Sequence, residues 1–117
     1  KYQEVITVRT DELIHELTYL KECAGSCAYP YVRFAGEKLS MNAPSGHLVT
    51  RVSMSGRGDM VVGFDLRYML DALKQFRKEP EVRIKLSGIY TPIVIEAEGR
   101  SDFALVLPVR LREERAA

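Results

Sequence analysis

Two cysteines and two histidines are the residues of this chain best suited to metal binding or catalysis. Cys23 and Cys27 lie four positions apart in the segment ECAGSCAY, and His15 and His47 are the only imidazoles. A structural zinc site needs four such ligands, usually in two closely spaced pairs, and the chain has no second cysteine pair. The spacing therefore favours reduced structural thiols, and we expect no metal ion and no cofactor.

His15 lies close to Glu12 and Glu16 and could transfer protons with one of these carboxylates. No Ser or Cys nucleophile, glycine-rich phosphate loop or convergent pair of carboxylates accompanies it. The pattern favours an exposed helical histidine and a non-enzymatic protein. An enzyme that uses His15 with Glu16 is kept as a third alternative.

The tripeptide Arg57-Gly58-Asp59 matches a cell-adhesion motif. It stands between the segments SMSG and MVVGF, where Gly and Asp are the residues that a tight hairpin requires. We therefore interpret it as a turn between two strands.

The chain has 117 residues, of which 46% are hydrophobic and 28% charged, as in one soluble globular domain. No apolar run approaches the roughly 20 residues of a membrane span, and the N-terminus lacks a signal-peptide pattern, so we expect a cytoplasmic protein. The formal charge of +1 excludes polyanion binding by bulk charge, so any nucleic-acid contact must come from local segregation of charge. Because the first residue is Lys, we expect a processed chain or a piece of a longer one.

The same order of patterns occurs twice along the chain. In the first half, a strand (EVITV) precedes a helix (TDELIHELTYLKEC) with Thr10 or Asp11 as its N-cap, and three short strands follow (YVRFAG, KLSMNAP and HLVTRVSMSG). In the second half, the strand MVVGF, the N-cap Asp65 and the helix LRYMLDALKQFRK precede VRIKLSG, PIVIEAEG and DFALVLPVRL. The apolar residues of both helices have the spacing i, i+1, i+4, i+7, which forms one face: Leu13, Ile14, Leu17 and Leu20, then Met69, Leu70, Leu73 and Phe76.

These patterns predict an α+β fold made of a duplicated βαβββ unit, with internal repeats at residues 2–56 and 59–111 of a single domain, 1–117. Each helix can bury its apolar stripe only against a sheet, so we expect two helices on one face of a mostly antiparallel sheet. Several short strands must then leave unpaired edges. Pro108 cannot donate to a ladder, so the last strand should end near Leu107 and leave Val109 and Leu111 to pack inward or to await a partner.

The helices differ in the charge of their exposed faces. Arg67, Asp71, Lys74 and Lys78 lie opposite the apolar set of the second helix, with Arg77 nearby, whereas acidic residues outnumber Lys21 on the first helix. A solvated surface explains both faces. A weakly basic face would also fit loose, sequence-independent phosphate contact.

The segments VVGFDLRYMLDALKQF, VRIKLSG, PIVIEAEG and ALVLPVRL resemble the third, C-terminal domain of the bacterial sliding clamp, the β subunit of DNA polymerase III. The resemblance covers nearly the whole chain and implies a DNA-clamp fold and a non-catalytic processivity factor. In that family two three-domain subunits close into a ring around duplex DNA, with helices lining the hole. It implies a cytoplasmic, nucleoid-associated bacterial protein whose partners are the polymerase, the clamp loader and repair proteins.

The resemblance also assigns residues to three surfaces. A pocket for short partner peptides is expected at Tyr29, Asp65, Tyr68, Tyr90, Pro92, Leu105, Val106, Leu107, Pro108, Val109 and Arg110. The DNA-facing residues are expected to be Lys21, Arg67, Lys74, Arg77 and Lys78. Cys23 and Ala24 fall at the ring interface, where the family tends to have larger aliphatic residues. The alternative from another class is a stand-alone clamp-like peptide-binding adaptor that does not encircle DNA.

Overall fold

The computed structural model describes residues 4–56 and 58–111, which form two helices and ten strands. The first half contains β1 (Glu4–Arg9), α1 (Thr10–Ala24), β2 (Tyr31–Ala35), β3 (Lys38–Ala43), β4 (Gly46–Arg51) and β5 (Met54–Gly56). The second half contains β6 (Val61–Asp65), α2 (Leu66–Lys74), β7 (Glu81–Leu86), β8 (Ile93–Glu96), β9 (Phe103–Val106) and β10 (Pro108–Val109). The two halves therefore have the same order of elements.

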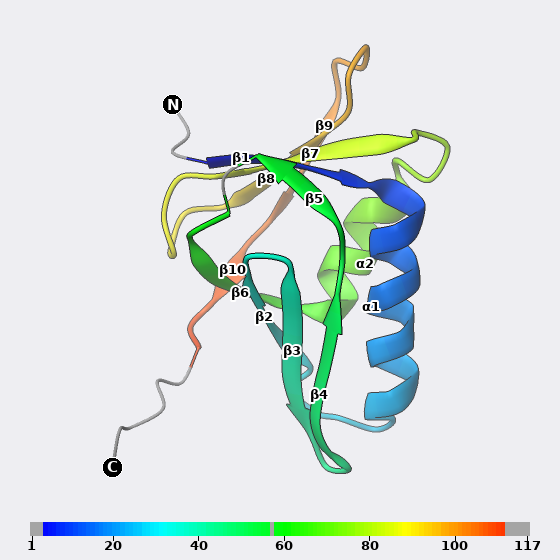
Figure 1. Cartoon of the computed structure of the whole chain (residues 1–117), viewed down its shortest axis with the longest axis vertical. Coiled ribbons are helices and arrows are strands. Elements are labelled where there is room, and N and C mark those ends of the chain that lie inside the picture. The colour runs from blue at the N-terminus through cyan, green and yellow to red at the C-terminus, as the bar shows by residue number, and fades with distance from the viewer. Residues whose placement is uncertain (1–3, 57, 112–117) are drawn as a thin grey trace.

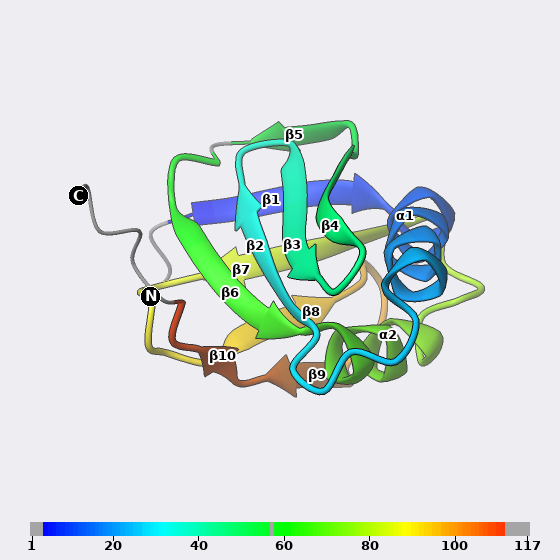
Figure 2. The same cartoon turned by 90° about the horizontal axis from the view of Figure 1, so that it is seen from below.

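The strands form two five-stranded sheets rather than one continuous sheet. The first sheet has the order β5-β1-β7-β8-β9 and the second the order β10-β6-β2-β3-β4. Each half thus gives its first and last strands to the sheet built on the other half, and every strand pair in the described residues is antiparallel. Figures 1 and 2 show the two sheets running across each other, with α1 and α2 side by side on one flank.

One hydrophobic core joins both sheets and both helices, and it confirms the predicted α+β clamp fold. Strand residues alternate between this core and the surface, as in Val32 and Phe34 of β2 or Val82, Ile84 and Leu86 of β7. The exchange of strands places the core between the halves, so neither half can bury its apolar face alone.

The helices bury the apolar stripes that their spacing predicts. On α1, Leu13, Leu17 and Leu20 are buried and Ile14 is partly buried. The predicted N-cap of α1 is wrong, since Arg9 precedes the helix without a side-chain cap and Thr10 is its buried first residue. Thr10 donates its backbone N–H to the carbonyl of Pro80 at 3.1 Å, so the chain before β7 satisfies that donor.

The second helix is shorter than predicted, because it ends at Lys74. Residues 75–78 form turns in which Phe76 and Arg77 donate their backbone N–H groups to the carbonyls of Leu73 and Lys74. Phe76 is nevertheless completely buried. The apolar periodicity therefore continues one turn beyond the regular helix.

The hairpin expected at Gly58-Asp59 does not form, since β5 pairs with β1 whereas β6 pairs with β2 and β10. This segment instead connects the two sheets, and Glu4 accepts backbone hydrogen bonds from Asp59 and Met60 at 3.2 and 3.1 Å. Arg57 lies outside the described residues.

Pro108 marks a similar change of sheet at the other end of the chain. The β9 ladder with β8 ends at Val106, and β10 then pairs with β6, with Pro108 opposite Phe64 and Val109 opposite Gly63. Leu111 lies over Gly63, where an added Cβ would be only 2.5 Å from Leu111 Cδ2. The end of the described chain therefore packs on the second sheet.

Candidate functional site

A groove of about 840 Å³ lies between α2 and the segment that runs from β9 into β10, and we call it the α2 groove. The helix forms one wall and the edge strand β9 with Leu107 forms the other. Its lining residues are Ala28, Tyr29, Tyr31, Asp65, Arg67, Tyr68, Asp71, Ala72, Gln75, Phe103, Ala104, Leu105, Val106, Leu107, Pro108 and Val109.

Large apolar side chains remain exposed around this groove. Leu107 is 69% exposed, Tyr68 62%, and Phe103 and Leu105 57% each. Phe103 and Leu105 alternate with the buried Ala104 and Val106, so the edge strand presents one apolar row to solvent. Exposed apolar side chains gathered around a groove are typical of a binding surface.

An ion pair between the buried Asp65 and the half-exposed Arg67 lines the groove. The Asp65 side chain is 5% exposed, accepts from the Arg67 backbone N–H at 2.9 Å as the N-cap of α2, and binds the Arg67 guanidinium at 3.0 and 2.7 Å. These hydrogen bonds lower the pKa of Asp65, although burial opposes the shift. Arg67 in turn lies beside the Tyr68 ring, 5.9 Å from its centroid.

Replacing Asp65 with Ala should lower the free energy of unfolding by about 1–2 kcal/mol, the usual cost of losing an N-cap. Urea denaturation at neutral pH measures this loss. Asp65→Asn keeps a capping oxygen and is the matched control, so it should cost less than Ala. An alanine variant as stable as the parent would contradict the role of this cap.

The same carboxylate should make stability depend on pH in the acidic range. The pKa of Asp65 is lower in the folded chain than the value of about 3.9 for an unfolded aspartate. Its contribution is therefore complete above pH of about 4 and is lost as the pH falls through the folded pKa. The difference in unfolding free energy between the parent and Asp65→Asn should shrink on acidification, and a constant difference would contradict this assignment.

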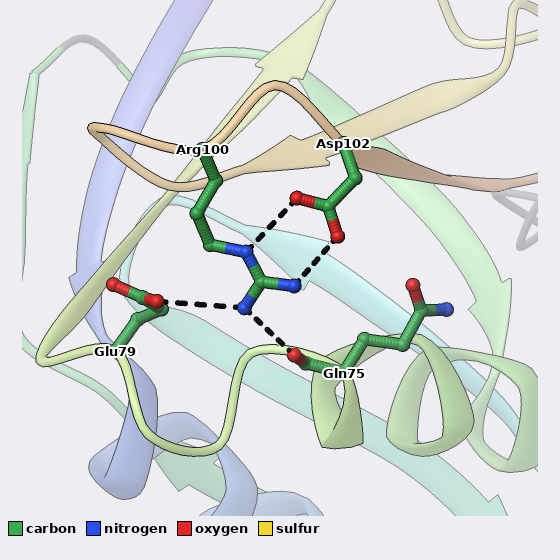
Figure 3. Close-up of polar contacts among 4 residues, drawn as sticks. All are labelled: Gln75, Glu79, Arg100 and Asp102. Atoms are coloured by element: carbon green, nitrogen blue, oxygen red, sulfur yellow. Dashed lines mark hydrogen bonds and ion pairs between the residues drawn. The ribbon is translucent and has the colours of Figure 1, made fainter.

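Arg100 connects the turn before β9 to the turn after α2, and Figure 3 shows its polar contacts. Its guanidinium donates to both oxygens of Asp102 at 2.9 and 2.6 Å, to the Gln75 carbonyl at 2.9 Å, and pairs with Glu79 at 3.4 Å. It also lies 4.6 Å from the centroid of the buried Phe76 ring. Arg100 thus fixes the turn before β9 to the turn after α2, and so holds one end of both groove walls.

Arg100→Lys should lower the melting temperature by a few degrees, because a lysine cannot make the bidentate pair and the carbonyl bond together. Thermal unfolding followed by circular dichroism measures the change. Lys74→Arg, on the exposed side of α2, is the control and should leave the melting temperature unchanged. An equal melting temperature for Arg100→Lys and the parent would show that the network adds no stability.

A second groove of about 840 Å³ lies on the outer face of the second sheet, and we call it the sheet groove. It is continuous with the α2 groove, because Tyr29, Tyr31 and Val109 line both. Its other lining residues are Arg33, Lys38, Ser40, Met41, Asn42, His47, Val61, Val62, Gly63, Ile89, Tyr90, Arg110 and Leu111.

The structure distributes the expected peptide-pocket residues over these two grooves. Those in the α2 groove are Tyr29, Asp65, Tyr68, Leu105, Val106, Leu107, Pro108 and Val109. Tyr90 and Arg110 line the sheet groove, with the Arg110 guanidinium 5.7 Å from the centre of the Tyr90 ring. Pro92 is exposed and lines neither groove.

The basic residues expected to face DNA do not form one helical stripe. Lys21 and Lys74 are exposed on α1 and α2, but Arg77 and Lys78 lie in the turns after α2. Arg67 is part of the α2 groove. At the expected ring interface, Cys23 is exposed whereas Ala24 is buried in the chain's own core.

Three further groove residues, Tyr31, Arg67 and Phe103, are not among the peptide-pocket residues expected from the sequence. Phe103 could have been found from the alternation of Phe103, Leu105 and Leu107. Tyr31 had no such signal, because Tyr29 lies before β2 begins. Arg67 could not have been found either, because its guanidinium turns back along the helix end to its own N-cap.

Among residues 4–56 and 58–111, no group of three or more His, Cys, Asp or Glu side chains could hold a metal ion. Glu12 accepts from the Ser53 backbone N–H at 3.1 Å and Glu16 accepts from Thr50 Oγ1, so both carboxylates tie α1 to the chain around β4. In the same part of the chain, neither helix has the length and apolar character needed to cross a membrane.

Solved structures that match this arrangement of two sheets and two helices include sliding clamps of bacterial DNA polymerase, which defines the class of the fold. The β subunit from Thermotoga maritima is 24% identical with a TM-score of 0.85, and the clamp from Bacillus subtilis is 25% identical with a TM-score of 0.83. Each match covers 96% of this chain and 32% of the other. A clamp from Bartonella birtlesii bound to griselimycin is 20% identical with a TM-score of 0.84, and its match covers 94% of this chain and 31% of that one.

The family model for the C-terminal domain of the DNA polymerase III beta subunit matches residues 1–110, so the chain belongs to this family. The chain spans about one third of the length of the clamp structures that it matches. No curated protein matches it.

Proposed function

We propose that this chain acts as the C-terminal domain of a DNA polymerase processivity clamp and binds short peptides of partner proteins in the α2 groove. The observation that carries the proposal is the row of exposed apolar residues, Phe103, Leu105 and Leu107, facing Tyr68 across the groove. Membership of the clamp family supports the same conclusion.

Peptide binding in this groove requires complementary surfaces and no chemical step. A Leu or Phe side chain of the partner peptide would lie between α2 and the row of Phe103, Leu105 and Leu107, where it covers apolar surface that is exposed in the free protein. The Asp65–Arg67 pair that lines the groove has polar groups that can orient a peptide backbone or a polar side chain. The protein therefore acts as a non-catalytic subunit.

The helix flank is the part of the chain proposed to face duplex DNA. Lys21, Lys74, Arg77 and Lys78 are exposed there. A few cations give weak, sequence-independent contact whose strength falls steeply with salt. Such contact permits sliding, and it would place the protein at the nucleoid.

A ring also requires parts that this chain does not contain. Edges of both sheets are unpaired in the described residues, and one of them is proposed to meet the first domain of a second subunit, near Cys23. Light scattering of the full-length gene product tests this: a dimer of a chain about three times longer is expected. A monomer of the present length would instead favour a stand-alone peptide-binding adaptor.

Fluorescence anisotropy with a labelled short peptide that contains Leu and Phe tests the peptide site directly. We expect saturable binding in the micromolar range, which corresponds to about −8 kcal/mol. The same peptide with Ala in place of Leu and Phe is the control and should bind at least tenfold more weakly. Equal affinity for both peptides would refute the proposed site.

A further inference from the structure

We propose that the sheet groove is a second subsite that binds acidic residues flanking the apolar anchors of the same partner peptide. This inference rests on the proposed function of the α2 groove and adds the charge of the partner. It is carried by the lining of the sheet groove, by cations there that have no ion-pair partner in the described part of the chain, and by the continuity of this groove with the α2 groove.

The lining of the sheet groove has one sign of charge. Arg33, Lys38 and Arg110 line it together with Tyr29, Tyr31 and Tyr90, and among residues 4–56 and 58–111 no Asp or Glu lines it. A concave surface that carries only positive charge attracts a segment of negative charge. The tyrosine rings add apolar surface and hydroxyl groups on which an extended peptide can lie.

The strand register keeps Arg33 away from acidic neighbours. Its direct partners are Gly63 on β6 and Ser40 on β3, so the guanidinium stands between two small residues on the outer face. In residues 4–56 and 58–111, Arg33 forms no ion pair. Its charge is therefore available to a ligand in the groove.

Lys38 also lines the groove, on β3 two residues from Ser40, the partner of Arg33. Lys38 lies directly opposite Arg51 on β4, and a like-charge pair across two strands is unfavourable. Neither residue has an ion-pair partner in the part of the chain that the structure describes. An acidic ligand would relieve this repulsion, which a neutral ligand cannot do.

The two grooves can be occupied by one peptide, since they meet at Tyr29, Tyr31 and Val109. The Tyr29 and Tyr31 rings are 5.9 Å apart and tilted by 58°, so together they line the passage between the grooves. Val109 lies opposite Gly63, in the row that continues to Arg33 and Ser40. An extended segment that leaves the α2 groove over Tyr31 therefore reaches Arg33 next.

The test compares labelled peptides on the 117-residue chain. One peptide contains only the Leu and Phe anchors. Two acidic peptides add four Asp or Glu residues, one before the anchors and the other after them. Each acidic peptide has a neutral match that carries Asn and Gln at the same positions. At low salt, one acidic peptide should bind roughly three- to tenfold more tightly than its neutral match. This gain should disappear near 0.5 M salt, because the contact is electrostatic.

Variants of the protein then test whether the higher affinity for the acidic peptide comes from the sheet groove. Arg33→Gln combined with Lys38→Gln should remove it and leave binding of the anchor peptide unchanged, and circular dichroism should show an unchanged fold. Lys74→Gln combined with Arg77→Gln removes the same charge outside the groove and should retain the gain.

Three results would overturn the inference. The first is equal binding of acidic and neutral peptides while the anchor peptide binds, and this leaves the proposed function intact. The second is a gain in affinity for the acidic peptide that survives the Arg33 and Lys38 substitutions. Binding of a labelled thymidine octanucleotide that requires Arg33 and Lys38, when acidic peptides show no gain, would equally overturn it. The third is failure of the anchor peptide to bind, which removes the proposed function and this inference together.

Discussion

Leu107→Asp is expected to lower the affinity for a Leu- and Phe-containing peptide at least tenfold while leaving the fold intact. Leu107 is 69% exposed, so its replacement removes little buried surface from the free protein. In the complex, the new carboxylate would be covered by an apolar anchor without a partner, at a cost of several kcal/mol. The lost burial of the leucine adds about 1.5–3 kcal/mol.

Fluorescence anisotropy measures the affinity, and thermal unfolding confirms that the variant folds. Val49→Asp is the matched control, because Val49 is an exposed apolar residue on the edge strand β4 and lines neither groove. The control should bind the peptide as the parent does. Unchanged affinity of a folded Leu107→Asp variant would exclude the α2 groove as the peptide site.

Phe76→Ala should lower the free energy of unfolding by about 3–5 kcal/mol, the usual cost of removing a buried aromatic ring. Phe76 is completely buried although it lies beyond the last residue of α2, and Arg100 covers one face of its ring. Its removal leaves a cavity under the turn that Arg100 also holds. A loss of this size is a large part of the total stability of an ordinary domain.

Urea denaturation of the two proteins measures this difference. Phe103→Ala is the control, since Phe103 is 57% exposed on β9 and should cost less than about 1 kcal/mol. A similar, small loss for both variants would show that the chain after α2 is not part of the core.

The elements of the fold could be predicted because the signals are local. The spacing i, i+1, i+4, i+7 identified the buried faces of both helices, and alternation identified the strands. Asp65 was predicted as an N-cap and is one, because a capping carboxylate acts on backbone groups only two residues away. At Thr10 the same rule failed, since long-range packing against the chain before β7 buries that residue instead.

The positions of the strands relative to one another could not be predicted from those signals. β1 pairs with β5 and β7 instead of with β2, and Pro108 starts a strand in the second sheet instead of ending the ladder altogether. Partners this far apart in sequence are selected by which faces fit together in the core, and periodicity within one strand carries no such information.

The candidate site was anticipated in part. The resemblance led to Tyr68, Asp65 and Leu107, which the fold brings to one groove, whereas Tyr90 and Arg110 lie in the neighbouring sheet groove. Helical periodicity assigned Arg67 to an exposed face, and Arg67 is exposed. Periodicity could not show that its guanidinium turns back to its own N-cap.

The sequence by itself determined the α+β class, the two buried helix faces and the similarity of the two halves, because these depend on contacts between near neighbours. Only the tertiary structure decided that the halves exchange strands, that two grooves meet at Tyr31, and that Arg33 and Lys38 line one groove with no ion-pair partner among the described residues. Those features arise where segments distant in the chain meet, and the burial of one shared core determines how they meet.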